Sequence, residues 1–176
     1  KVFISASAVG YYGERGDEVL SDSAHAGSGF LADLCVAWEA AADTIQSERT
    51  VKARFGVVLS PEGGFLRQLT PIFTALGASR LGSGQQWLSW IHIDDLSEAL
   101  LRALEDPQLS GPINMVAPQP VRNATLTQDL ARTLSTFTAP PVPALAIKLL
   151  YGELSSALLG SQRVVPEKLA ASGFRW

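Results

Sequence analysis

Residues 90–96, Trp-Ile-His-Ile-Asp-Asp-Leu, constrain the fold of this chain more than any other stretch. Apolar and polar residues alternate and then meet two aspartates, which predicts a short strand that runs directly into a helix N-terminus. Asp94 and Asp95 are expected to cap this helix, because a carboxylate accepts hydrogen bonds from free first-turn amides and favours the positive end of the helix dipole. We expect His92 to fix the corner by a hydrogen bond. The alternatives are an acid or base role for His92 and a catalytic or metal-binding aspartate pair.

Strand patterns and helix patterns alternate along the rest of the chain. Apolar runs at residues 2–5, 51–59, 87–93 and 112–117 predict strands. Helices are expected at residues 30–46, 65–76, 95–105, 125–136, 144–159 and 166–171, the fourth with a hydroxyl cap. This alternation predicts the α/β class with a largely parallel sheet.

The segment 30–46 has the clearest helical periodicity. Phe30, Leu34 and Trp38 fall at i, i+4 and i+8, with Cys35 beside them. Such spacing puts these side chains on one face, which we expect to be buried against the sheet.

The chain length suits one domain or one domain with a small appendage. Of its 176 residues, 47% are hydrophobic, which supports a sizeable core. The run Pro140-Pro141-Val142-Pro143 is typical of a rigid linker. We expect a first unit over residues 1–120 and a small helical segment over residues 121–176.

Charge and cysteine content exclude several classes of partner. The net charge of −3 gives no basic surface for nucleic acid or an anionic membrane, and no apolar run is long enough to span a bilayer. The single cysteine, Cys35, excludes an internal disulfide and fits a cytoplasmic location. No histidine and cysteine cluster has metal-ligand spacing, so no metal is expected. Because Lys1 opens the chain within a strand pattern, we expect a fragment or a processed chain.

Ordered motifs link the chain to a known family. Residues 5–13 read Ser-Ala-Ser-Ala-Val-Gly-Tyr-Tyr-Gly, residues 54–61 read Arg-Phe-Gly-Val-Val-Leu-Ser-Pro, and residues 82–86 read Gly-Ser-Gly-Gln-Gln. With the stretch 90–96 and the Pro-Val-Arg-Asn of residues 120–123, they resemble the C-terminal half of the extended short-chain dehydrogenase/reductase family, also called the epimerase/dehydratase family. The closer match is an atypical bacterial epimerase family branch with a small C-terminal segment of unknown function, which residues 160–164 resemble. The resemblance covers nearly the whole chain.

This resemblance implies the C-terminal portion of a Rossmann-like parallel sheet with a small helical substrate lobe. It also implies NADP or NAD as the cofactor of the full-length protein. The glycine-rich turn that holds the cofactor pyrophosphate has no counterpart among these 176 residues, so no cofactor is expected to bind this chain alone.

The family's proton-transferring pair, Tyr-x-x-x-Lys, is lost. The tyrosine position corresponds to Phe30 or Leu31, and the lysine position to Leu34 or Cys35. None of these side chains can supply the family's phenolate beside an ammonium, so the standard mechanism is not expected. The resemblance implies three catalytic residues: Ser7, which corresponds to the serine that hydrogen-bonds the reacting oxygen, and the nearby Tyr11 and Tyr12. Glu39 matches a family glutamate and is expected to be structural.

The other motifs imply cofactor and substrate contacts. The cofactor-binding candidates are Ser5, Gly56, Val57 and Val58, although plain core packing is the alternative for both valines. The substrate-pocket candidates are Gln85, Gln86 and Trp90. Leu88 and Ser89 replace the Arg-Asp of sugar-nucleotide members, which removes a guanidinium contact to the diphosphate. Arg67 and Arg80 are candidates to replace that charge.

Two kinds of function remain open at this point. The first is an NAD(P)-dependent oxidoreductase, epimerase-like, acting on an unknown small molecule when the protein is complete. The second is a non-catalytic dinucleotide-binding sensor or a protein-interaction module, and a homodimer is a further option. Loss of the tyrosine and lysine favours the second, whereas retention of Ser7 and Gly56 favours the first.

Overall fold

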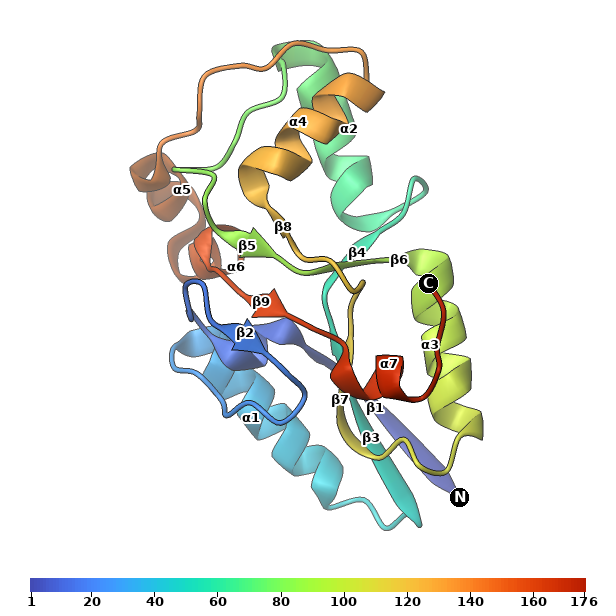
Figure 1. Ribbon diagram of the computed structural model, residues 1–176. Coiled ribbons are helices and arrows are strands. Elements are labelled where there is room, and N and C mark those ends of the chain that lie inside the picture. Colours follow the sequence, from blue (N-terminus) through green and yellow to red (C-terminus); the bar gives the residue numbers. More distant parts are fainter.

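A parallel sheet with helices on both faces organises the chain. The computed structural model describes residues 1–176, apart from the side chain of Leu154. Strands β1 (Val2–Ala8), β3 (Arg49–Phe55) and β7 (Gly111–Met115) form the sheet in the order β1-β3-β7, and both pairs are parallel. Helix α1 (Phe30–Asp43) lies on one face and α3 (Ile93–Glu105) on the other (Figure 1). The predicted α/β class with a parallel sheet is confirmed, and the arrangement is Rossmann-like.

The predicted strand 51–59 is two strands, broken at Gly56. After β3, the chain continues as β4 (Val57–Leu59), which pairs in parallel with β6 (Trp90–His92). A Cβ at Gly56 would lie 2.7 Å from the main-chain oxygen of Ser89, so only glycine lets the chain before β6 come this close. The amide of Val57 donates to that same oxygen at 2.8 Å. Gly56 therefore serves close backbone packing at the point where the sheet divides.

A smaller lobe lies beyond the end of the sheet. Helices α2 (Gly64–Leu76) and α4 (Asn123–Thr133) pack on each other through Phe73, Ala131 and neighbouring leucines, and β5 (Trp87–Leu88) pairs antiparallel with β8 (Val121–Arg122) (Figure 1). The expected hydroxyl cap of α4 is wrong. Its cap residue is Arg122, which makes no side-chain capping bond.

The C-terminal segment returns to the first part of the chain. It contains α5 (Ala144–Tyr151), the 3-10 turn η2 (Gly152–Leu154), α6 (Ser155–Leu159), β9 (Arg163–Val164) and α7 (Glu167–Ala171). The expected single helix over 144–159 is interrupted at Gly152, which adopts a left-handed φ of 55°. Strand β9 pairs in parallel with β2 (Val19–Leu20), just beyond the 3-10 turn η1 (Val9–Tyr12). The boundary near residue 120 stays a prediction.

The expected buried face of α1 is wrong. Phe30, Leu34 and Trp38 are 51%, 48% and 57% exposed, and Cys35 is half-buried. The face turned to the sheet carries Glu39 together with Ala32 and Ala42. The reason is the polar surface of the sheet on this side, where an arginine of β3 needs a carboxylate partner.

The corner before α3 is fixed by His92. Its Nδ1 accepts a hydrogen bond from the amide of Asp94 at 3.3 Å, so the histidine is the cap residue. The interpretation of His92 as the residue that fixes the corner is confirmed, whereas the expectation that Asp94 or Asp95 caps the helix is wrong. Asp94 and Asp95 lie two and three residues after this cap, in the first turn, where they still favour the helix dipole.

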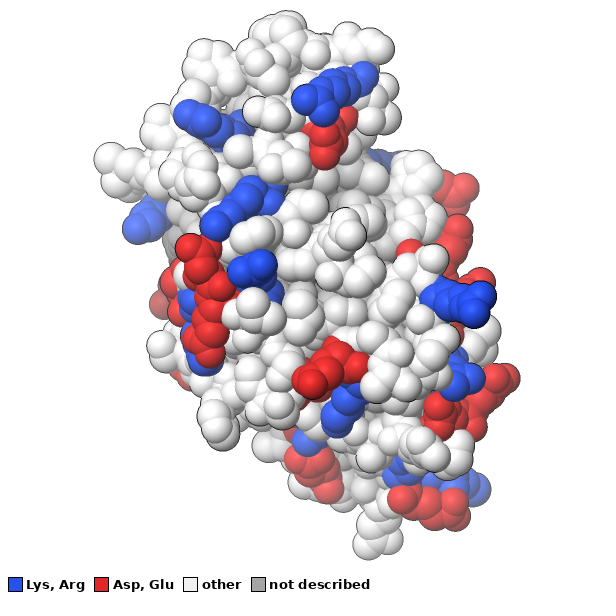
Figure 2. Space-filling model, viewed as in Figure 1, with Lys and Arg blue, Asp and Glu red and all other residues white. Residues whose placement is uncertain are grey.

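Charged side chains of both signs are mixed on one face of the molecule. Lysine and arginine lie among aspartate and glutamate over the face seen in Figure 2, without an extended area of one sign. Within the described part of the chain, no helix is long and apolar enough to cross a membrane.

Candidate functional site

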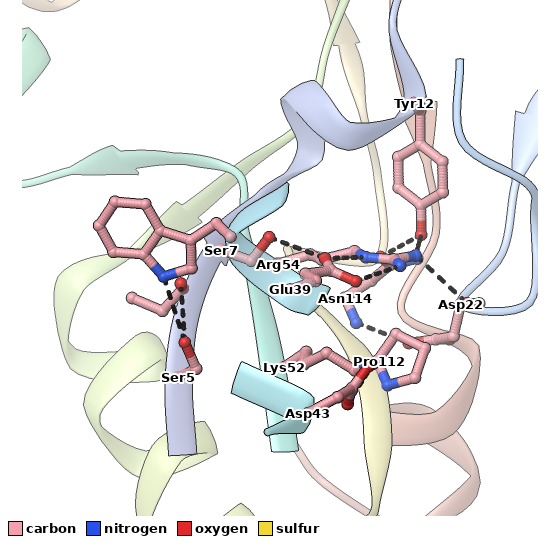
Figure 3. A network of polar contacts seen from close by, with 12 residues as sticks. Ser5, Ser7, Tyr12, Asp22, Glu39, Asp43, Lys52, Arg54, Pro112 and Asn114 are labelled. Atoms are coloured by element: carbon pink, nitrogen blue, oxygen red, sulfur yellow. Dashed lines mark hydrogen bonds and ion pairs between the residues drawn. The ribbon is translucent and has the colours of Figure 1, made fainter. Parts of the chain in front are cut away.

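A buried ion pair lies between α1 and the sheet. The Nε of Arg54 donates to Glu39 Oε1 at 2.7 Å and its Nη2 donates to Oε2 at 2.8 Å (Figure 3). Both side chains are less than a tenth exposed. Burial would lower the pKa of Arg54, but its bonds to Glu39 and Tyr12 raise it above the ordinary value. This bidentate geometry fixes the orientation of the Arg54 guanidinium and the Glu39 carboxylate.

The two tyrosines of η1 lie against the same guanidinium in different ways. Tyr12 is fully buried, and its hydroxyl accepts from Arg54 Nη1 at 2.9 Å. The hydroxyl lies 2.7 Å from Asn114 Oδ1 and 3.0 Å from the main-chain oxygen of Ser21, either of which can accept its proton. Burial raises the pKa of Tyr12, so the phenol stays neutral. Tyr11 is half-buried and its ring lies 3.5 Å from the Arg54 guanidinium carbon.

Ser5, in the middle of β1, and Ser7, near its end, both point toward α1. Ser7 Oγ donates to Glu39 Oε1 at 2.8 Å, so its single proton is directed into the protein (Figure 3). Ser5 is buried and its Oγ accepts from Trp38 Nε1 at 3.3 Å. Cys35 lies on the same side, where burial raises the pKa of its thiol. Glu39 therefore holds both Ser7 and Arg54, which agrees with its expected structural role.

The same network reaches the C-terminal segment. Asn114, on β7, donates from Nδ2 to the main-chain oxygen of Val165 at 3.0 Å. Asp22 accepts from the amide of Asn114 at 2.6 Å and from the amide of Lys168 at 3.0 Å. A continuous set of polar contacts thus joins Ser7 at the end of β1 to the chain after β9.

A cavity of about 470 Å³ opens beside the N-terminus of α1. Its near wall is η1 and the first turn of α1, including Gly10, Phe30 and Leu31. Its far wall belongs to the C-terminal segment and includes Lys148 and Glu153. Phe30 and Leu31, the two candidates for the position of the family's proton-transferring tyrosine, both line this cavity. Ser7, Tyr11 and Tyr12 do not line it.

A second cavity of about 450 Å³ shares Glu14, Lys148 and Leu159 with the first. Gln85 and Gln86 both line it. The side-chain amide of Gln86 also donates to the main-chain oxygens of Leu81 at 3.1 Å and Leu158 at 3.4 Å.

The remaining predicted contacts lie apart from these cavities. The Trp90 indole donates to the main-chain oxygen of Gln119 at 3.1 Å, outside both cavities. Val57 and Val58 form β4 and are half-buried, with Val58 packed against the core beneath α3. Of the predicted substrate residues, the structure therefore brings Gln85 and Gln86 together at a cavity and leaves Trp90 elsewhere.

Sequence reasoning missed the members of the network other than Ser7, Tyr12 and Glu39. Arg54 was seen only as the start of a motif, and Asp22 and Asn114 were not singled out. One signal was available, since Asn114 lies between Ile113 and Met115 in a strand pattern, and a polar residue in such a place needs a buried partner. No cluster of metal-ligating side chains occurs among the described residues.

The comparisons with known proteins agree with these motifs. A family model described as "Domain of unknown function (DUF1731)" matches residues 142–176. An epimerase family protein of Mycobacterium bovis is 45% identical over 176 residues, which cover 98% of this chain and 58% of the relative. The chain thus spans less than two thirds of the curated relatives' length.

Two solved structures extend the comparison. The crystal structure of human epimerase family protein SDR39U1 with NADPH is 30% identical and superposes with a TM-score of 0.94, covering all of this chain and 61% of the human one. A nucleoside-diphosphate sugar epimerase from Corynebacterium glutamicum is 40% identical with a TM-score of 0.77, covering 99% of this chain and 35% of that one.

Proposed function

We propose that the chain is the C-terminal part of an NAD(P)-dependent oxidoreductase of the epimerase family of extended short-chain dehydrogenases and reductases, and that this enzyme acts on a small molecule. The observation that carries this proposal is the likeness to the human relative solved with NADPH, which extends over the whole chain. The order of the motifs and the match of residues 142–176 to the family model further support this proposal.

The residues of this chain fit the reacting end of such a cofactor and not its pyrophosphate. A cavity of about 470 Å³ at the carboxyl end of β1 is within the usual range for a small-molecule site. Gly63 and Gly64 open α2 after β4, but they lack the third glycine of a dinucleotide fingerprint. When bound, the nicotinamide would exchange hydride with the substrate. Val57 and Val58 on β4 are the candidates to border its ring.

The side chains at the end of β1 support a mechanism other than the tyrosine and lysine one. Phe30, Leu31, Leu34 and Cys35 occupy the family positions, and none is a phenol or an amine. Ser7 does not line the cavity, but its oxygen keeps free lone pairs after its proton goes to Glu39, so a substrate hydroxyl that extends from the cavity to the end of β1 would donate to it. Tyr11 is the better partner for it, because the Tyr12 hydroxyl is held in the core.

Cofactor binding is the direct test. Calorimetry of the full-length protein with NAD+, NADH, NADP+ and NADPH should give low micromolar binding for one pair, while this chain alone should bind none appreciably. Failure of the full-length protein to bind any of the four would defeat the proposal. Tight binding by the chain alone would show that the phosphate site lies within it.

Turnover separates the enzyme from its main rival. Cofactor oxidation or reduction would be followed for the full-length protein against carbonyl and alcohol substrates. Ser7→Ala should lower kcat/KM by about 10- to 1000-fold, the loss that follows removal of one positioned hydrogen-bonding group. Cys35→Ala is the matched control and should change activity little. Unchanged activity in folded Ser7→Ala protein would remove Ser7 from the site.

A non-catalytic dinucleotide-binding sensor is the second candidate. The observation that favours it is the internal use of the polar groups, since the protons of Ser7 and Tyr12 both go to protein acceptors. Tight cofactor binding without turnover on any substrate would support the sensor over the oxidoreductase.

A further inference from the structure

We infer that the C-terminal segment of unknown function forms one wall of the substrate cavity, and that Lys148 on this wall binds an anionic group of the substrate, a carboxylate or a phosphate. The inference rests on the proposed function in calling the ligand a substrate. Seven residues of the segment 142–176 line the first cavity: Lys148, Glu153, Ser155, Ser156, Leu159, Gly160 and Gln162. Those residues face η1 and the first turn of α1 across the cavity.

The far wall is held in place by contacts that do not involve Lys148. The Glu14 carboxylate accepts from the amide of Ser161 at 2.7 Å, and Gln162 Nε2 donates to the main-chain oxygen of Gly13 at 3.0 Å. Further along, Ser89 Oγ accepts from the amide of Val164 at 2.9 Å. Because these bonds join the segment to the near wall directly, the cavity is part of the fold and not a gap between independent units.

The charges around the two cavities leave Lys148 as the cation available to a ligand. In the second cavity, Arg122 is paired with Asp17 at 2.6 Å and its guanidinium lies 4.0 Å from the Trp87 ring. Within the described residues, no carboxylate lies within 4.0 Å of the Lys148 ammonium. Lys148 lines both cavities, so the same ammonium is available to a ligand in either.

The two carboxylates that line the first cavity, those of Glu14 and Glu153, differ in their surroundings. The Glu14 carboxylate accepts hydrogen bonds from two main-chain amides, those of Gly16 at 3.1 Å and Ser161 at 2.7 Å. It therefore joins the two walls of the cavity. Glu153 is exposed and lines the first cavity only. The first turn of α1, which also lines this cavity, has Gly29 as its cap residue and no side-chain cap, so its amides remain donors. The free amides of this turn and the Lys148 ammonium are the donors that an anionic group would meet in the cavity.

The substrate class follows from what is present and what is missing. Lysine presents a compact point charge that suits a single carboxylate or phosphate. The forked contact of an arginine to a diphosphate is lost at Leu88 and Ser89. The cavity therefore suits a small substrate with one anionic group, next to the apolar side chains of Phe30 and Leu31.

Anion binding by the full-length protein tests this inference. Inorganic phosphate and malonate would be titrated calorimetrically into protein saturated with NADPH, which fills the cofactor's own phosphate sites, with glycerol as the neutral probe. We expect millimolar binding of one anion, weakened about tenfold in Lys148→Ala and largely retained in Lys148→Arg. The two anions distinguish a phosphate from a carboxylate substrate. Lys148 is exposed, so both variants should fold.

Matched variants locate the effect. Glu153→Gln removes an opposing charge from the same wall and should tighten anion binding. Arg132→Ala removes an exposed cation of α4 that lines neither cavity and should leave binding unchanged. Equal affinity in Lys148→Ala and wild type, or no anion binding by wild type, would overturn the inference. If NADPH itself does not bind, the proposed function fails, and the same anion titration without nucleotide still decides the role of Lys148.

Discussion

Helices α1 and α3 lie on opposite faces of one sheet, yet they bury opposite kinds of side chain (Figure 1). Helix α3 places Leu96, Ala99 and Ala103 in the main core. Helix α1 has a similar length and richer apolar content, but it turns Phe30, Leu34 and Trp38 outward and buries Glu39.

The difference originates in the strands and not in the helices. Side chains alternate along β1 and β3, so Ile4, Val51 and Ala53 pack on the α3 side. Ser7 and Arg54 lie on the α1 side, where both bond Glu39. Hydrophobic periodicity thus shows which residues share a helix face, while the facing sheet decides which face is buried.

Breaking the buried ion pair should have the largest effect. Glu39→Ala leaves the Arg54 guanidinium buried without its partner, so we expect a loss of about 3–5 kcal/mol in the free energy of unfolding. Urea denaturation of the full-length protein measures it. The double variant Glu39→Ala/Arg54→Met should recover part of the loss, because no buried charge then remains. A loss under about 1 kcal/mol in the single variant would mean that the pair is not buried in the complete protein.

Leucines on the two helices give the next contrast. Leu96→Ala should cost about 2–5 kcal/mol because it opens a cavity in the core. Leu34→Ala on the outer face of α1 should change stability by no more than about 0.5 kcal/mol. The same denaturation series compares them. Equal costs would contradict this and indicate that the complete protein or a second subunit covers the outer face of α1.

Local patterns predicted the fold class well, because the alternation of strands and helices can be recognised from short-range hydrophobic periodicity. The division of the sheet at Gly56 was not predictable, since it depends on the approach of the Ser89 main chain from 33 residues further along the chain. The break at Gly152 carried a local signal, because a glycine within an apolar helix pattern weakens the prediction of a continuous helix.

The candidate site was predictable only where a motif marked it. Gln85 and Gln86 were selected from their position before Trp90, and both line a cavity. The bonds of Arg54 to Glu39 and Tyr12 join residues on three different elements, so no spacing along the chain reveals them. Lys148 lay within an apolar helix pattern, where a single lysine has no special meaning until the opposite wall of the cavity is known.

Removing the Tyr12 hydroxyl should have an intermediate effect. Tyr12→Phe leaves Arg54 and Asn114 each short of one buried partner, which should cost about 1–3 kcal/mol. Circular dichroism during urea denaturation measures this loss near neutral pH. An unchanged free energy of unfolding in Tyr12→Phe would indicate that water contacts Arg54 and Asn114.

The same variant has a pH signature. The pKa of Tyr12 in the folded protein is raised above its unfolded value of about 10, chiefly by burial. Its neutral form therefore stabilises the fold fully below about pH 10, and this contribution is lost as the pH rises through the folded pKa. Wild type should lose stability more steeply than Tyr12→Phe above about pH 10. If the free energy of unfolding fell with pH equally in wild type and Tyr12→Phe, the result would contradict the burial of the phenol.

The smallest effect concerns the cap of α3, which distinguishes this helix from α1, whose cap residue is a glycine. His92→Ala removes the acceptor of the Asp94 amide, and because the bond is 3.3 Å long and partly exposed, the expected cost is about 0.5 kcal/mol. Asp94→Ala should cost only a few tenths of a kcal/mol, since an exposed first-turn carboxylate contributes through the helix dipole alone. His25→Ala, at the other and exposed histidine, is the control and should be neutral. A larger loss for Asp94 than for His92 would restore the aspartate as the cap, and loss of ligand binding in folded His92→Ala protein would give the histidine a role in the site.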